Sequence, residues 1–245
     1  MLIEQKVKDL LIDFGPPRKN VRPYYPFIRL ANDNIWSFNK SEYIDTKRDY
    51  PGKYLIENNI SAGFNSFVLV SLKQNPGLIK RLVDFILNNN FPASLHPDIL
   101  RSTGLSEFLP KSGQIRDPNF REKILVAYNF KCAICDYAVR IKNQLVGVEA
   151  AHIKWHQAGG PSEIINGIAL CSLHHKLFDS GAFTINDGFK IIVSEMVNGS
   201  GSEEILYRYD NKEINYPRNK KYFPDDNFLE WHVCEVFKDY KLLKK

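Results

Sequence analysis

Long apolar runs are missing from this chain of 245 residues. No stretch approaches the roughly 20 continuous apolar residues that a membrane-spanning helix needs, which argues against a helical membrane protein. The N-terminal segment MLIEQKVKDLLIDFG carries acidic residues among its apolar ones and lacks a small-residue cleavage site. We therefore expect an amphipathic helix there instead of a signal peptide, and a cytoplasmic location.

Cysteine is scarce and unevenly placed. The chain has four cysteines, Cys132, Cys135, Cys171 and Cys234. Without an export signal a reducing compartment is expected, where a close cysteine pair more often binds a metal or performs redox chemistry than forms a structural disulfide. Cys234 stands alone in an apolar helical segment, and we expect it to be an inert core residue.

Charge of one sign is not in large excess. The formal net charge is +5, and residues 1–115 carry 15 basic against 11 acidic side chains. A mildly basic front half suits a phosphate backbone. An ordinary solvated surface with a slight excess of basic residues explains the same numbers. Charge alone therefore does not decide between a DNA-binding surface and an ordinary one.

Apolar periodicity and turn residues predict an α+β chain. Helices are expected over 1–15, 77–90, 95–104, from Asp117-Pro118 onward, over 166–180 and in NFLEWHVCEVF. Extended structure is expected over 24–38, with a turn at Asn32-Asp33-Asn34, and strands are expected over 146–153, 183–185, 189–194 and 204–209. Residues 105–118 contain Gly, Ser and two Pro, and are expected to be a linker. We predict a mixed, mainly helical domain over 1–112 and a second domain over 113–245.

Two pairs of metal-binding residue types share the same spacing. The pairs are Cys132-x-x-Cys135 and Cys171-x-x-His174. A two-residue gap lets both members of a tight turn face one ion, and four nitrogen and sulfur ligands make a closed tetrahedral zinc site of the structural kind. The alternative, four unmetallated core residues, fits two paired gaps poorly. The zinc is expected to hold the base of the segment inserted between the pairs.

The inserted segment and the helix after it contain His152, Asn166 and His175. Adjacent helical residues point about 100° apart, so His174 can face the zinc while His175 faces another pocket. The run C-x2-C…AAHI…GGP…NGIALC-x2-HH-x-LFD-x-GAFTI resembles the HNH nuclease motif in its zinc-bound form. The resemblance covers residues 120–185, with the histidine, asparagine and histidine 14 and then 9 residues apart. It implies a ββα-metal fold and an endonuclease.

The resemblance also implies a role for each of the three residues. His152 would be the general base that takes a proton from water beside the scissile phosphate. Asn166 would hold the loop against the strand and orient His152. His175 would ligate a divalent cation, Mg²⁺ or Mn²⁺, in a reaction that leaves 5′-phosphate and 3′-hydroxyl ends.

One position departs from the family pattern. Many members carry an acid or a histidine just before the catalytic histidine as a second metal ligand, and this chain has Ala151 there. Asn166, Glu149 and His156 are the candidates to replace it. Glu149 would face away from His152 on a regular strand, so His156 is the preferred candidate if the chain bends.

The front half is expected to select the target. Its segments YPFIRLANDNIWSF and NNNFPASLHPDIL resemble the N-terminal part of McrA-type, modification-dependent restriction enzymes, some of which carry a sulfur-binding domain for phosphorothioate DNA. An apolar pouch flanked by donors would suit a thio-phosphate. The residues expected to build it are Phe91, Pro92, Leu95 and His96, with Arg22 or Arg29 on the DNA backbone. The alternative is that they are core and turn residues.

These features together predict a modification-dependent restriction endonuclease that senses phosphorothioate DNA. Three alternatives stay open: a sensor of methylated or otherwise modified bases, a homing or repair nuclease for plain DNA, and a non-catalytic zinc-stapled DNA-binding module. The partner is expected to be double-stranded DNA. A homodimer is expected as well, because one metal-dependent site cuts one strand at a time.

Overall fold

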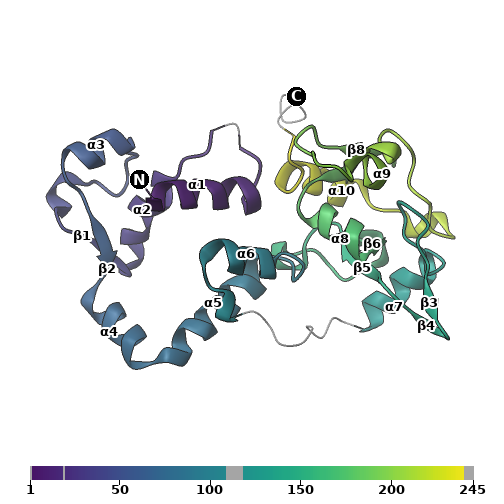
Figure 1. Cartoon of the computed structure of the whole chain (residues 1–245), viewed down its shortest axis with the longest axis horizontal. Coiled ribbons are helices and arrows are strands. Elements are labelled where there is room, and N and C mark those ends of the chain that lie inside the picture. The colour runs from purple at the N-terminus through teal and green to yellow at the C-terminus, as the bar shows by residue number, and fades with distance from the viewer. Residues whose placement is uncertain (1, 19, 109–117, 240–245) are drawn as a thin grey trace. The chain divides into compact units, whose positions relative to one another are not determined.

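A computed structural model describes residues 2–18, 20–108 and 118–239 (Figure 1). The chain contacts define two compact units, one of Met1–Asp13 with Asn20–Ile86 and one of Phe14–Lys19 with Leu87–Lys245. The boundary between the units falls inside a helix, well before the expected linker. Most of that linker, residues 109–117, lies outside the described residues.

The first unit is mainly helical, as predicted. Phe27, Trp36 and Phe64 pack edge to face beside a short two-stranded sheet, in which β1 and β2 are antiparallel. The bounds are α1 (Leu2–Phe14), α2 (Tyr24–Arg29), β1 (Trp36–Phe38), α3 (Gly52–Glu57), β2 (Ala62–Phe64), α4 (Ser66–Gln74) and α5 (Pro76–Asn90), which continues into the second unit.

The prediction of extended structure over 24–38 is wrong for its first part. Tyr24–Arg29 is helical, a 3-10 turn follows over Leu30–Asp33, and only Trp36–Phe38 is a strand. Pro26 is the third residue of α2, where a backbone N–H has no partner inside the helix. Proline is therefore compatible with a helix here.

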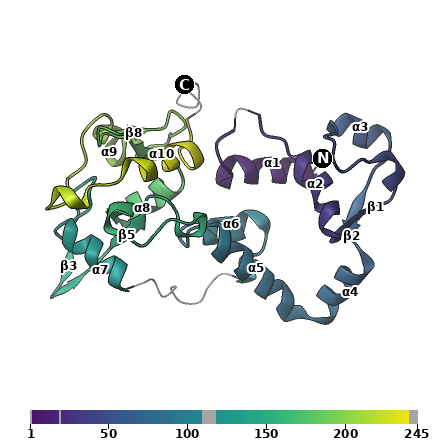
Figure 2. The same cartoon turned by 180° about the vertical axis from the view of Figure 1, so that it is seen from behind.

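The second unit contains a ββα arrangement. β5 and β6 pair antiparallel, from Val148↔Cys171 at one end to His152↔Gly167 at the other. α8 begins directly after Cys171, the last residue of β6. β5 lies beside α8 in both views (Figures 1 and 2), and α7 packs on the same hairpin. The bounds are α6 (His96–Thr103), α7 (Pro118–Ala127), β3 (Arg140–Ile141), β4 (Gln144–Leu145), β5 (Val148–His152), β6 (Gly167–Cys171), α8 (Ser172–Asp179), β7 (Phe183–Ile185), β8 (Ile191–Val193), α9 (Ser202–Ile205) and α10 (Asp226–Glu235).

Two further element predictions in this unit are wrong. The segment Gly167–Cys171 is a strand and not the start of a helix, and all five of its residues are buried. A strand covered on both faces lacks the alternation that marks a strand in sequence. Gly167 allows close packing there, because a Cβ atom would lie 2.3 Å from Ile124 Cδ1 and would displace that buried side chain. The strand expected over 204–209 is instead the end of α9 and a 3-10 turn, Tyr207–Tyr209.

The core of this unit forms between the hairpin, α8 and α10. Phe178, Phe183 and Phe237 are fully buried, and the ring of His232 stacks on Phe178 with centroids 3.7 Å apart. Cys234 is exposed, so the expectation of a core cysteine is wrong. The α+β class, with a helical front part, is confirmed. Within the described residues, no helix has the length and apolar character required to cross a membrane.

Candidate functional site

The two predicted ligand pairs form one cluster. The donor atoms of Cys132, Cys135, Cys171 and His174 all lie within 4.8 Å of one another. Cys135 Sγ is 4.0 Å from Cys171 Sγ, and Cys132 Sγ is 3.6 Å from His174 Nδ1. Tetrahedral zinc with ordinary bond lengths separates two sulfurs by about 3.8 Å, and a sulfur and a nitrogen by about 3.6 Å. The cluster therefore fits a structural zinc ion.

Local backbone contacts bring the two pairs together. The N–H of Asp136 bonds to the carbonyl of Cys132 and closes the first turn, and the N–H of Ala133 bonds to Ala169 in β6. Cys171 ends β6, and its sulfur accepts the backbone N–H of His174 at the start of α8. One cysteine is thus both the last residue of the strand and the N-cap of the helix.

Hydrogen bonds among the cluster's own side chains shift the pKa values of Cys171 and His174. A hydrogen bond from Cys132, and a smaller effect of one from Cys135, hold the pKa of the Cys171 thiol far below its usual value. Burial lowers the pKa of His174, but hydrogen bonds with Cys135 and Cys171 outweigh it and raise that pKa to about 10. The Nε2 atom of His174 lies 2.9 Å from the carbonyl of Ile205, which leaves Nδ1 to face the sulfurs.

The next residue, His175, faces a different site, as the helical geometry predicts. It lines a cleft of about 460 Å³ in the second unit, together with His152 from the end of β5. The described residues that line this cleft are Pro92, Ala93, Ser94, Phe120, Arg121, Ala150, His152, Trp155, His156, Gln157, Ser162, His175 and Asp179. Two of the three residues expected to act in catalysis thus share one cavity.

The His152 ring is held on two sides. It stacks on Phe120 of α7 with centroids 4.0 Å apart and planes 13° apart. Its Nε2 atom is 3.3 Å from the hydroxyl of Ser162. The aromatic stacking limits rotation of the imidazole, and the hydroxyl can fix which nitrogen carries the proton.

Asn166 is fully buried behind the cleft and braces its backbone. Its Oδ1 accepts the N–H of Lys154 at 2.9 Å, and its Nδ2 donates to the carbonyls of Lys154 and Pro161. The asparagine therefore ties the loop after His152 to the residue before β6. Gly160 is part of this brace, because a Cβ there would lie 1.9 Å from the Lys154 oxygen.

Both ring nitrogens of His175 have carboxylate neighbours. Nδ1 lies 2.7 Å from Glu149 Oε2, and Nε2 lies 3.2 Å from Asp179 Oδ2. Glu149 contacts the imidazole from β5 and is not among the residues that line the cleft, whereas Asp179 lines it. The i, i+4 spacing of His175 and Asp179 is visible in the sequence, although the site prediction does not include Asp179.

The cleft lining includes one more predicted residue, His156, and two residues of α7 that the site prediction does not include, Phe120 and Arg121. His156, the preferred second ligand, lines it with its Nδ1 3.3 Å from the carbonyl of Gly160. Arg121 adds a guanidinium, whose Nη2 also donates to the carbonyl of Val148. Phe120 and Arg121 come from α7, and no spacing in the sequence indicates that this helix covers His152.

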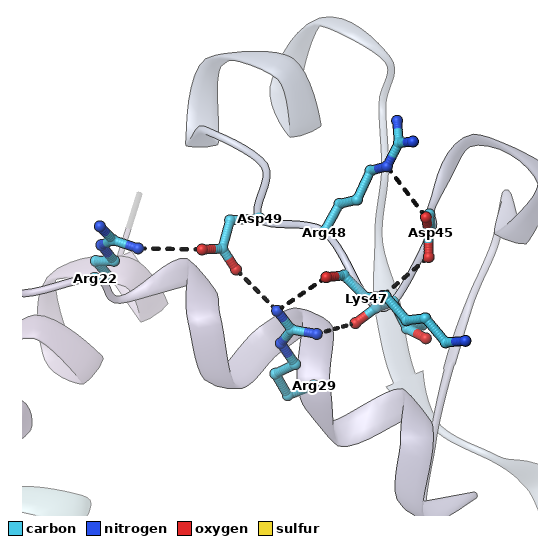
Figure 3. Close-up of polar contacts among 7 residues, drawn as sticks. Arg22, Arg29, Asp45, Lys47, Arg48 and Asp49 are labelled. Carbon is cyan, nitrogen blue, oxygen red and sulfur yellow. Dashed lines mark hydrogen bonds and ion pairs between the residues drawn. The ribbon is translucent and has the colours of Figure 1, made fainter.

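The arginines predicted to contact DNA lie in the first unit, where both form ion pairs with Asp49 (Figure 3). Asp49 accepts from Arg22 through Oδ2 and from Arg29 through Oδ1, at 3.1 Å each. Arg29 also donates to the carbonyls of Thr46 and Lys47, so it holds the loop that carries Asp49. Arg22 has a side chain 67% exposed and lines a cavity of about 330 Å³ with Tyr24, Tyr25 and Tyr50.

The four residues of the expected pouch belong to the second unit. Leu95 and His96 are buried, and the Nε2 atom of His96 is bonded to the carbonyls of Leu87 and Phe91. Pro92 lines the cleft that holds His152. The contacts thus place these four residues in the second unit, whereas Arg22 and Arg29 belong to the first unit.

Comparisons with known proteins match two separate parts of the chain, and the first match extends beyond the boundary at Ile86 that the contacts define. Residues 2–108 match the family of ScoMcrA-like DNA sulfur-binding domains, and residues 132–186 match the HNH endonuclease family. The resemblance to HNH nucleases joined to a sulfur-binding domain is thereby confirmed. The chain therefore joins a region that matches DNA sulfur-binding domains to one that matches HNH endonuclease domains.

Searches with the whole chain add little to the domain matches. Among solved structures, a modification-dependent restriction endonuclease, TagI, is similar at 20% identity and a TM-score of 0.36. The match covers 49% of this chain and 38% of that one, so the chain spans well under half the length of that enzyme. The search of curated proteins gave no match.

Proposed function

We propose that this chain is a metal-dependent endonuclease that cuts double-stranded DNA carrying a chemical modification, with phosphorothioate as the modification sensed. The observation that carries the proposal is that His152 and His175 line one cleft, beside a separate cluster fit for zinc. A closed site with four ligands supports the fold, whereas a cleft keeps space for water and a phosphate.

The residues of the cleft suit hydrolysis of a phosphodiester. His152 takes the proton of the attacking water, and Phe120 and Ser162 keep its ring in place. Arg121 supplies a positive charge for a phosphate oxygen. His175 would hold Mg²⁺ or Mn²⁺, and the acceptor Glu149 on its Nδ1 directs Nε2 to the ion. A bound divalent cation would neutralise the phosphate and stabilise the leaving 3′ oxygen.

The choice of modification rests on the front domain. The match of residues 2–108 to DNA sulfur-binding domains favours phosphorothioate over a modified base. Sulfur is larger and less hydrated than oxygen, so apolar side chains can discriminate it. Phe91 and Pro92 stay our candidates for that contact, with Arg22 or Arg29 on the DNA backbone. Leu95 and His96 are buried, so they would support such a pouch instead of touching the sulfur. The homodimer also stays a proposal, because one metal-dependent site cuts one strand at a time.

Digestion of matched plasmids tests the function. Unmodified, phosphorothioate and 5-methylcytosine plasmids are incubated with Mg²⁺ or Mn²⁺ and the zinc-loaded chain. We expect cleavage of the phosphorothioate plasmid, and a loss of at least about 100-fold in the His152→Ala variant, the scale of general base catalysis. The products should carry 5′-phosphate and 3′-hydroxyl ends.

Each other outcome favours one alternative. Cleavage of the methylated plasmid alone indicates a sensor of modified bases, and equal cleavage of all three indicates a homing or repair nuclease. DNA binding without any cleavage indicates a zinc-stapled binding module. Wild-type activity in His152→Ala would contradict the assigned general base. Zinc content of the variant, measured alongside, shows that it has folded.

A further inference from the structure

The cleft lacks a cation ligand at the position where many HNH proteins carry one. Ala151 stands there, fully buried and with no donor atom. Asp179 is the single carboxylate among the described residues that line the cleft. Asp179 is therefore the candidate for the missing ligand.

Asp179 and His175 lie one turn apart on α8, so their side chains project from the same face of the helix. Asp179 Oδ2 is 3.2 Å from His175 Nε2. Two neighbouring ligands of an octahedral Mg²⁺ ion at about 2.1 Å are separated by about 3 Å. The two side chains thus already have the separation that a shared ion requires.

The two ring nitrogens of His175 face different carboxylates, and Nε2 is the one next to Asp179. Glu149 occupies Nδ1 from β5, at 2.7 Å. A carboxylate on one ring nitrogen commonly orients the other nitrogen of a histidine toward a metal. Nε2, the nitrogen nearest Asp179, is therefore the ligand atom, and Glu149 orients the ring.

The carboxylate of Asp179 is only 2% exposed. A buried charge needs compensation, and its described contacts within this unit include the imidazole of His175 and the hydroxyl of Ser94. A hydroxyl carries no charge, and the imidazole is shared with Glu149. A divalent cation in the cleft would balance the two carboxylates around one imidazole.

We propose that Asp179 is the second protein ligand of the cation in the cleft, in the place that Ala151 leaves vacant, and that Ser94 positions its carboxylate. The inference rests on the proposed function only for the use made of that cation. Two protein ligands suit Mg²⁺ and Mn²⁺, which keep several waters or substrate oxygens. Among the described residues, the group with three or more ligands is the Cys–His cluster, which fits this division.

Ser94 gives the inference a second consequence. Its hydroxyl donates to Asp179, and Pro92, Ala93 and Ser94 form part of the cleft. These residues fall within the match to DNA sulfur-binding domains, which covers 2–108. The region that matches DNA sulfur-binding domains would thus contribute Ser94 to position a ligand in the part of the chain that matches HNH endonucleases.

Binding of Mn²⁺ to the full, zinc-loaded chain tests the ligand. Electron paramagnetic resonance of free Mn²⁺ gives the affinity, measured with and without a DNA duplex. We expect Asp179→Asn to weaken Mn²⁺ binding at least about 10-fold and His175→Ala to remove it. The matched control is Asp98→Asn, because Asp98 is a half-buried carboxylate that contacts Lys176 and Arg101 outside the cleft lining. It should bind as the wild type does.

A cysteine at the same position gives an independent readout. In Asp179→Cys a thiolate replaces the carboxylate, so preference should shift from Mn²⁺ toward Cd²⁺ by about 10-fold or more. A purely structural aspartate predicts no such shift. Ser94→Ala should weaken Mn²⁺ binding about threefold, and Ser94→Thr should restore it.

The outcomes separate this inference from the proposed function. Wild-type Mn²⁺ affinity in Asp179→Asn, or no Mn²⁺ binding by the wild type with or without DNA, overturns the inference even if DNA is cut. Binding that depends on Asp179 in a chain that cuts no DNA supports the inference and overturns the nuclease proposal. If Asp179→Asn loses its zinc and fails to fold, the Cd²⁺ preference of Asp179→Cys decides.

Discussion

His174 and His175 are neighbours in sequence and serve two sites of opposite design. His174 faces three cysteine sulfurs in a cluster where all four donors lie within 4.8 Å. His175 faces a cleft of about 460 Å³ that it shares with His152. A turn of about 100° along α8 separates the two directions.

The difference between the sites lies in how many ligands the protein supplies. Four protein ligands leave a tetrahedral ion no open position, so the Cys–His cluster can only join segments of the chain. The cleft offers fewer protein ligands and keeps space for water and substrate. If this comparison is correct, damage to the cluster should unfold the unit, whereas damage to the cleft should spare the zinc.

Loss of a cluster ligand should have the largest effect. In Cys135→Ser the weaker hydroxyl replaces a thiolate, and we expect zinc to be lost along with cooperative unfolding of the second unit. Structural zinc contributes on the order of 10 kcal/mol in small zinc domains, which is comparable to the whole stability of a typical domain. Metal analysis and near-ultraviolet circular dichroism measure both consequences.

Cys234→Ser is the matched control for this prediction. Cys234 is exposed and is not part of the cluster, so this variant should keep its zinc and its unfolding transition. A Cys135→Ser variant that keeps full stability after zinc removal would show that the cluster is dispensable for the fold. The comparison between the two sites would then fail on its structural side.

Removal of the Asn166 brace should have an intermediate effect. Asn166→Ala deletes three buried hydrogen bonds to Lys154 and Pro161, which together stabilise the unit by about 3 kcal/mol. We expect a lower urea midpoint and at least about 10-fold slower DNA cleavage, because the loop after His152 loses its support. Zinc content should stay the same.

Two glycines sharpen that test. In Gly160→Ala the new Cβ would lie 1.9 Å from the Lys154 oxygen, so the variant should reproduce the losses of Asn166→Ala. In Gly188→Ala the nearest atom is Asn186 Oδ1 at an ordinary 3.5 Å, so stability should barely change. Equal stability of the two glycine variants would mean that the brace does not support the loop.

The zinc cluster was predictable from sequence because its spacing is local. Two pairs with two-residue gaps place four ligands on two turns, whatever the rest of the chain does. The HNH residues were identified from a sequence motif that extends over a turn, a strand and a helix. The cleft walls were not predictable, because Phe120 and Ser94 reach His152 and Asp179 only through tertiary packing.

Secondary structure failed where burial or position overrides the local pattern. β6 is apolar at every position because both of its faces are covered, so it was indistinguishable from a buried helix. α2 contains Pro26 and two tyrosines, which favour extended structure, but the proline lies where a helix tolerates it. Long amphipathic helices such as α5 were predicted to within one residue.

The smallest predicted effect concerns His232, a histidine that belongs neither to the Cys–His cluster nor to the cleft lining. It is fully buried against Phe178, and Thr184 and the carbonyl of Phe178 bond to its ring. Burial lowers its pKa to about 4, from an ordinary value of 6.5, although the nearby charge of Asp179 acts in the opposite direction. The ring is therefore neutral in the folded chain well below neutral pH.

The sign of the pH dependence follows from that lowered pKa. Between pH 6.5 and 4 the unfolded chain binds a proton on His232 that the folded chain does not, so stability falls as pH falls through this range. The contribution of His232 is complete above pH 6.5, and we expect a loss of about 2 kcal/mol by pH 5. Urea unfolding at pH 7.5 and 5 should show the loss in the wild type and in His156→Gln, whose substitution lies in the cleft. His232→Gln should be less stable at pH 7.5 yet lose less on acidification. An unchanged difference between the two pH values in His232→Gln would place the titrating group elsewhere.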